Sequence, residues 1–145
     1  MAAGTIETLV GSQRPIAIVD DNSDDLFQLQ HELKFLFGET PVLSFSNGLA
    51  LLNYLQHPLS EKERPALILL DLHMDKVNGL RTLEFLRAHG TLADIPVVIV
   101  SGTKDTRDML ATYRSGAKGF LHKPLVRGEL IKALRGRPQQ IETRF

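Results

Sequence analysis

The sequence contains no cysteine, no net charge and no long apolar run. Without cysteine there is no disulfide framework and no thiolate metal site, so packing alone must hold the fold. The 17 Lys and Arg residues balance 17 Asp and Glu residues, which removes any overall attraction to nucleic acid or to an acidic membrane. No stretch approaches the roughly 18 apolar residues of a membrane span, and the first 15 residues do not resemble a signal peptide. We therefore expect a cytoplasmic protein that binds neither nucleic acid nor membrane.

The sequence does have enough apolar surface for one core. Its 145 residues, 43% of them hydrophobic and 23% charged, are typical of a single soluble domain. The patterned segments all fall within residues 15–135, where we predict the domain. Residues 1–14 and 136–145 are expected to be tails.

Five short apolar runs are separated by amphipathic segments. Uninterrupted runs of Val, Ile and Leu are typical of strands in a parallel sheet whose two faces are both covered by helices. The runs that we expect to be strands are residues 16–19, 42–45, 66–70, 97–100 and 120–121.

Each apolar run is followed by a segment whose apolar residues have helical spacing. The first such helix is expected to begin near Asn22 or Ser23, which can cap a helix, and to end at Gly38. The other helices are expected between a cap at Ser46 or Asn47 and the break at Pro58, and at residues 79–88, 105–114 and 126–135.

Strand and helix thus alternate five times along the chain. This alternation favours right-handed crossovers and a parallel sheet between two layers of helices, and five units are too few for an eight-stranded barrel. The sequence therefore predicts an α/β fold of the doubly wound, flavodoxin-like (βα)5 class with a five-stranded parallel sheet. Ligands bind such sheets beyond the carboxyl ends of the strands, so a site is expected among the residues that follow the runs.

Charged and hydroxyl side chains follow four of the five predicted strands. Asp20 and Asp21 follow the first strand, Asp71 the third, Ser101 the fourth and Lys123 the fifth. Two carboxylates about 4 Å apart repel by roughly 4 kcal/mol at an effective dielectric near 20, so positive charge must lie among them. Lys123 supplies one charge. A hard divalent cation would supply the rest, and Mg²⁺ fits carboxylate ligands better than a metal that prefers His or Cys.

The same groups would form a receptacle for a phosphoryl group. The phosphoryl oxygens can be shared among a divalent cation, an ammonium group, a hydroxyl and backbone N–H groups. The nucleophile would be a carboxylate, and Asp71, alone at the end of the central strand, is better placed than Asp20 or Asp21. Gly102 would allow the backbone to approach the phosphoryl group closely.

Four motifs in this order resemble the receiver domain of two-component response regulators, in its single-domain, chemotaxis-regulator-like form. The resemblance covers nearly the whole of residues 14–135. Its motifs are the acidic pair at Asp20 and Asp21, the segment 69–74 around Asp71 with Asn78 and Gly79 after it, Ser101 with Gly102, and the segment 119–124. Any one motif alone is weakly informative, but all four in this order are hard to obtain by chance.

The resemblance implies roles for the acidic residues. Asp71 is the expected phosphorylated residue. Asp21 would bind Mg²⁺ directly, and Asp20 would reach the metal largely through water. Asp71 and the backbone carbonyl of His73 would complete the protein ligands.

The resemblance also implies roles outside the acidic cluster. Ser101 and Lys123 would hold the phosphoryl oxygens, and Phe120 would be a switch aromatic that rotates inward when the Ser101 hydroxyl moves toward the phosphate. The peptide bond between Lys123 and Pro124 would be cis. One departure is Asp75, which occupies a position where proline is common in the family.

The function implied is that of a stand-alone receiver, a signalling domain rather than an enzyme. It would accept a phosphoryl group on Asp71 from a sensor histidine kinase or a histidine phosphotransfer protein in a Mg²⁺-dependent reaction. Phosphorylation would change the surface of the fourth helix, fifth strand and fifth helix, around residues 107–113, 118–122 and 126–134. A downstream protein, or a second copy in a homodimer, would bind there.

Other functions are open at this point. A receiver that no longer cycles phosphate would be a constitutive interaction module, with Asp75 distorting the acceptor loop. A phosphohydrolase of the haloacid dehalogenase type ranks low, because it needs a second Asp two residues after the nucleophile, where this sequence has His73. Nucleotide binding ranks lower still, because neither GxxxxGK[ST] nor GxGxxG occurs.

Overall fold

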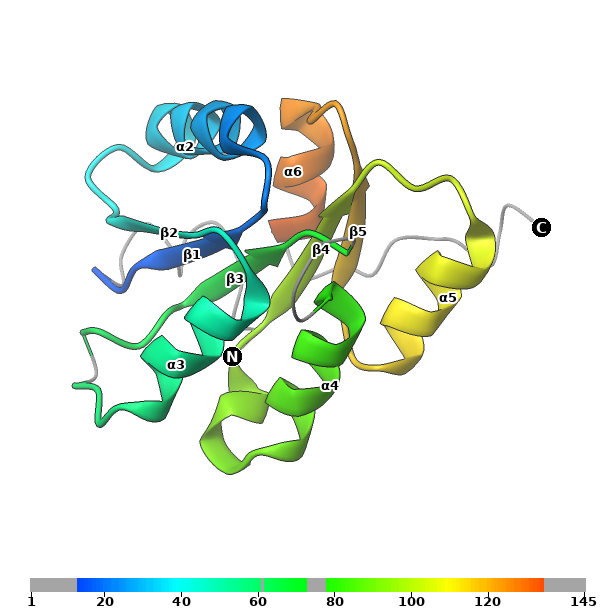
Figure 1. Cartoon of the computed structure of the whole chain (residues 1–145). Helices are drawn as coiled ribbons and strands as arrows, with labels where there is room; N and C mark the ends of the chain where they lie inside the picture. The colour runs from blue at the N-terminus through cyan, green and yellow to red at the C-terminus, as the bar shows by residue number, and fades with distance from the viewer. Residues whose placement is uncertain (1–12, 61, 73–77, 135–145) are drawn as a thin grey trace.

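The apolar runs form one parallel sheet with helices on both faces in the computed structural model, which describes residues 13–60, 62–72 and 78–134 (Figure 1). The strands lie in the order β2-β1-β3-β4-β5, and all four pairings are parallel. Their bounds are β1 (Ile16–Val19), β2 (Val42–Phe45), β3 (Leu67–Leu70), β4 (Val97–Ser101) and β5 (Gly119–His122). The predicted doubly wound, flavodoxin-like fold is confirmed.

The helices alternate with the strands, and helix α2 and helix α6 cover one face of the sheet while α3, α4 and α5 cover the other (Figure 1). Three of them begin in the same way: the side chains of Asn22, Asn47 and Asn78 each accept the backbone N–H three residues further on. The helices are α2 (Ser23–Phe37), α3 (Gly48–Gln56), α4 (Gly79–Ala88), α5 (Thr106–Arg114) and α6 (Arg127–Leu134), with a 3-10 helix η1 (Gly90–Asp94). The 3-10 helix was not expected from the sequence.

Both faces of the central strands are buried, which explains the continuous apolar runs. Along β1, Ile16 and Ile18 pack with α2 and α6, whereas Ala17 and Val19 pack with residues of α3, α4 and α5. Only some of the apolar side chains of helix α2 pack into this core, since Phe27 remains 73% exposed. No helix of the described residues is long and apolar enough to cross a membrane.

Arg14 belongs to the folded body, although the sequence analysis assigns it to the amino-terminal tail. Its guanidinium donates hydrogen bonds to the backbone carbonyls of Arg64 and Pro65, at 3.0 and 2.7 Å. These bonds join the segment before β1 to the segment before β3. The described structure therefore extends at least one residue beyond the predicted start of the domain.

Gly79 begins α4 directly against the backbone of Asp71, and we expect Gly79→Ala to destabilise the protein. A Cβ at this position would lie 2.1 Å from the Asp71 carbonyl oxygen, so α4 would have to shift. Overpacking of this kind typically lowers the free energy of unfolding by about 1–3 kcal/mol, measurable by urea denaturation. The matched control is Gly128→Ala in the first turn of α6, where a Cβ meets no atom within 4 Å. Equal unfolding free energies for the two variants would contradict the prediction.

Candidate functional site

The carboxyl ends of β1 and β3 bring the three predicted aspartates together. The strand order reverses between these two strands, which is where ligands bind in doubly wound sheets. The backbone N–H of Asp71 donates to the carbonyl of Val19 at 2.9 Å, which fixes the end of β3 beside β1. One carboxylate oxygen each from Asp20, Asp21 and Asp71 lie within 4.8 Å of one another. Asp20 and Asp71 are buried and Asp21 is exposed, so the cluster has one side open to solvent.

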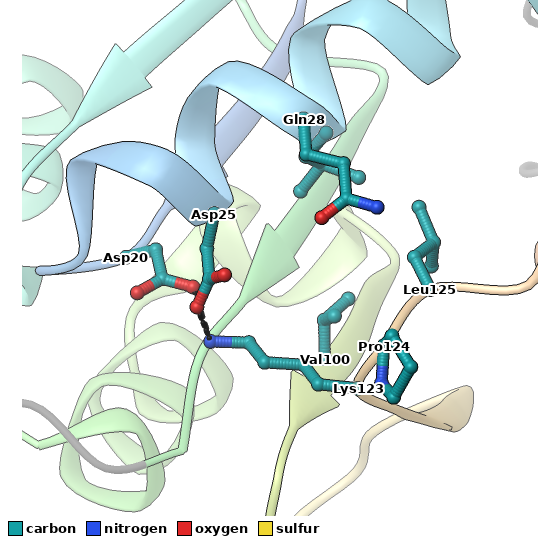
Figure 2. Close-up of a pocket in the computed structure, with 8 residues that line it drawn as sticks. Asp20, Asp25, Gln28, Val100, Lys123, Pro124 and Leu125 are labelled. Atoms are coloured by element: carbon teal, nitrogen blue, oxygen red, sulfur yellow. Dashed lines mark hydrogen bonds and ion pairs between the residues drawn. The ribbon is translucent and has the colours of Figure 1, made fainter.

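The ammonium group of Lys123 lies among these carboxylates. Its Nζ atom is 2.6 Å from Asp20 Oδ2, 2.8 Å from Asp25 Oδ2 and 3.7 Å from Asp71 Oδ2. Figure 2 shows the Lys123 side chain reaching from the segment after β5 toward Asp20 and Asp25. Burial alone would lower the pKa of Lys123, but the hydrogen bonds to Asp20 and Asp25 and the charge of Asp71 outweigh it and raise the pKa. The site therefore keeps a fixed positive charge.

A cavity of about 310 Å³ opens beside Lys123, between α2 and the segment that follows β5 (Figure 2). The peptide bond between Lys123 and Pro124 is cis. The cavity is lined by Asp20, Asp25, Gln28, Leu29, Val100, Lys123, Pro124 and Leu125. Asp20, Asp25 and the Lys123 ammonium lie together at one end of the cavity, whereas Gln28 lies further along α2 (Figure 2).

Ser101 and Phe120 lie on β4 and β5, the two strands next along the sheet from β3. Ser101 is the last residue of β4 and is 1% exposed, and its hydroxyl oxygen accepts the backbone N–H of Thr103 at 3.2 Å. Phe120 is 3% exposed and packs in the core on the face of α3, α4 and α5. Its ring is therefore inward in this structure, and its switching role stays a prediction.

Some predicted features cannot be placed in the structure. His73, with the expected backbone ligand, and Asp75, the departure from the family, lie outside the described residues.

A Cβ at Gly102 would meet no atom within 4 Å, so packing within the protein does not require glycine there. The close approach of Gly102 to a phosphoryl group stays a prediction.

Asp25 is a residue of the site that the sequence analysis missed. It lies in the first turn of α2, where its backbone N–H donates to the Asn22 side chain and its carboxylate accepts from Lys123. The available signal was its spacing of four residues after Asp21, about one helical turn. That spacing alone does not reveal the contact, because Lys123 comes 98 residues later in the chain.

The three clustered aspartates fit a divalent cation. Carboxylate oxygens are the ligands that Mg²⁺ and other hard cations prefer, and Mg²⁺ keeps several waters, which the exposed side at Asp21 can admit. Neutralising the cluster would also relieve the repulsion that a single ammonium leaves uncompensated. Asp20, Asp21 and Asp71 are thus the described residues that could hold the metal.

Residues 16–135 match the family described as the response regulator receiver domain. The chain belongs to this family, whose members act in two-component signalling.

Among curated relatives, response regulator Rcp1 of Synechocystis sp. (strain ATCC 27184 / PCC 6803 / Kazusa) is 29% identical over 123 residues, covering 83% of this chain and 84% of Rcp1. Transcriptional regulatory protein PrrA of Mycobacterium leprae (strain TN) is 32% identical over 126 residues, covering 87% of this chain. The chain spans 50% of the length of PrrA. The similarity to PrrA therefore concerns only part of that protein.

Solved structures of receiver proteins share the fold. The Mn²⁺-bound form of Rcp1 superposes with a TM-score of 0.70 at 29% identity, covering 85% of this chain and 90% of that one. The bacteriophytochrome response regulator AtBRR gives a TM-score of 0.74 at 31% identity, covering 85% and 91%. The aspartate cluster of the present chain fits a divalent metal such as the one in the Rcp1 structure.

Removing one carboxylate from the cluster should weaken divalent binding without unfolding the protein. We expect Asp21→Asn to raise the dissociation constant for Mn²⁺ by about tenfold or more. Even in bulk water two unit charges about 4 Å apart interact by about 1 kcal/mol, the metal carries two charges, and tenfold is about 1.4 kcal/mol. Asp21 is exposed, so the unfolding free energy should stay near that of the wild type.

The measurement is the loss of the free Mn²⁺ electron paramagnetic resonance signal during titration. The control is Asp24→Asn, which removes the same charge from an exposed position that does not belong to the cluster. Equal affinities for the two variants would show that the cluster does not bind the metal.

Proposed function

We propose that Asp71 accepts a phosphoryl group from a phosphohistidine on a sensor histidine kinase or a histidine phosphotransfer protein. The observation that supports this most directly is the meeting of buried Asp71 with Asp20, Asp21 and the ammonium of Lys123 at one edge of the sheet. An oxygen of Asp71 attacks phosphorus, and the P–N bond to the donor imidazole breaks as the P–O bond forms. The imidazole keeps the electron pair and takes up a proton.

The surrounding residues each have a part in this reaction. Asp20, Asp21, Asp71 and the backbone carbonyl of His73 would hold Mg²⁺, which would supply positive charge to the phosphoryl oxygens. Lys123 stabilises the same oxygens, since its ammonium lies 3.7 Å from Asp71 Oδ2 and can turn toward a phosphoryl group there. Ser101 donates its hydroxyl to a phosphoryl oxygen. Water later hydrolyses the acyl phosphate and returns Asp71 to its carboxylate form.

The signal passes to protein partners through the surface of α5, β5 and α6. Phosphorylation adds about 1.5 to 2 negative charges to a pocket that is already acidic, and Ser101 and Lys123, which end β4 and follow β5, respond to it. Phe120, three residues before Lys123 on β5, packs on the face of α5, and Leu121 of the same strand packs with α6, so a shift of this segment reaches both helices. A downstream protein or a second copy of the chain binds the altered surface.

The proposal is tested by incubating the protein with phosphoramidate and Mg²⁺ and measuring intact mass. The wild type should gain one phosphoryl group, and Asp71→Asn should gain none because it lacks the nucleophile. Asp24→Asn, with the same loss of charge nearby, should be phosphorylated like the wild type. Chelation of the metal should suppress the adduct.

A different outcome would favour another function. If the wild type binds Mg²⁺ and gains no phosphoryl group, Asp71 is not an acceptor. The chain would then be a receiver-like interaction module that does not cycle phosphate.

A further inference from the structure

Asp25 connects Lys123 to α2 across the edge of the cavity (Figure 2). An ammonium group has three N–H donors. Two of those on Lys123 are directed to Asp20 at 2.6 Å and to Asp25 at 2.8 Å, whereas Asp71 Oδ2 lies at 3.7 Å, beyond hydrogen-bond distance. The ammonium is therefore held toward α2 and away from the proposed acceptor.

The two carboxylates that hold Lys123 differ in what could replace the ammonium. The Asp20 side chain is 5% exposed, so losing Lys123 would leave a buried charge unless another cation took its place. Asp20 belongs to the cluster that fits a divalent cation, which could provide that compensation. The Asp25 side chain is 35% exposed and is not in the cluster, so water can solvate it. The pair between Lys123 and Asp25 is thus the one that can open at low cost.

We propose that Asp25 is a positioning residue that restrains Lys123 and competes for its ammonium with the phosphoryl group on Asp71. This inference rests on the proposed acceptor function of Asp71. A phosphoryl group attracts the ammonium, while the negative charge of Asp25 pulls it back toward α2 and repels the incoming anion. The strength of the pair between Lys123 and Asp25 therefore lowers the affinity of the site for the phosphoryl group. Phosphorylation weakens this link between the segment after β5 and α2.

The test uses beryllofluoride, BeF₃⁻, a tetrahedral mimic of a phosphoryl group on a carboxylate, titrated by ¹⁹F NMR at a Mg²⁺ concentration that saturates each variant. Asp25→Asn should bind BeF₃⁻ about 3- to 10-fold more tightly than the wild type, because one competing unit charge is removed near the bound anion. Asp25→Ser removes the same carboxylate with a smaller side chain and should give the same gain. Asp25→Glu keeps the charge and should restore an affinity close to that of the wild type.

The sign of the effect separates restraint from a merely structural role. If Asp25 only ordered Lys123 for phosphoryl binding, removing its carboxylate would weaken BeF₃⁻ binding. Asp24→Asn removes an equal charge from an exposed position in the same turn of α2 and should change the affinity by less than about twofold. An equal gain in Asp24→Asn would overturn the proposal, because the effect would then be one of general charge.

The remaining outcomes distinguish the two levels of inference. If the wild type binds BeF₃⁻ and neither Asp25→Asn nor Asp25→Ser binds it more tightly, the restraint by Asp25 is wrong while the acceptor site stands. If the wild type binds no BeF₃⁻ at saturating Mg²⁺, the acceptor function of Asp71 fails, and the role of Asp25 fails with it.

Discussion

Electrostatic repulsion among Asp20, Asp21 and Asp71 is the constraint on which the site depends. The sheet order sets β1 beside β3, so the residues that end these strands must lie close together. Clustered carboxylates are unfavourable unless positive charge lies among them. Lys123 provides one such charge, and it is shared with Asp25. The pocket is therefore acidic even with its lysine in place, and that imbalance is what makes it suited to a divalent cation.

The carboxylates stay close together despite this repulsion, because backbone hydrogen bonds and strands covered by helices on both faces hold them in place. The backbone N–H of Asp71 is tied to β1 through Val19, and the N–H of Gly79 donates to the carbonyl of Leu72 at 2.9 Å. Asp20 accepts the N–H of Asn22 at 2.9 Å. These bonds lie next to strands that are buried on both faces, so the cluster cannot relax by moving the strands apart.

The strands and most helix ends could be predicted from the sequence because their signals are local. Short apolar runs marked β1 and β2 to the residue, although Ser44 interrupts the run of β2, and the start of β3 differs from its expected position by one residue. Helix α4 has the predicted ends, since Asn78 supplies the cap. The 3-10 helix η1 was missed because its five residues are too few to show a period. Phe27 fits the helical pattern of α2 yet is exposed. The spacing of apolar residues identifies a helix, but it does not show how much of the helix surface the core covers.

The acidic cluster could be predicted from the sequence, whereas the contact between Asp25 and Lys123 could not. Parallel strands carry their carboxyl ends to one edge, so the closeness of Asp20, Asp21 and Asp71 follows from topology and needs no knowledge of side-chain direction. The contact between Asp25 and Lys123 depends on how the first turn of α2 is oriented over the segment after β5, which only the folded chain specifies.

The aspartates that topology brings together and Asp25 therefore differ in how each would affect the site. The sheet order brings Asp20, Asp21 and Asp71 together, whereas the half-buried Asp25 is the residue through which, in our proposal, the first turn of α2 adjusts how strongly Lys123 is drawn toward the acceptor.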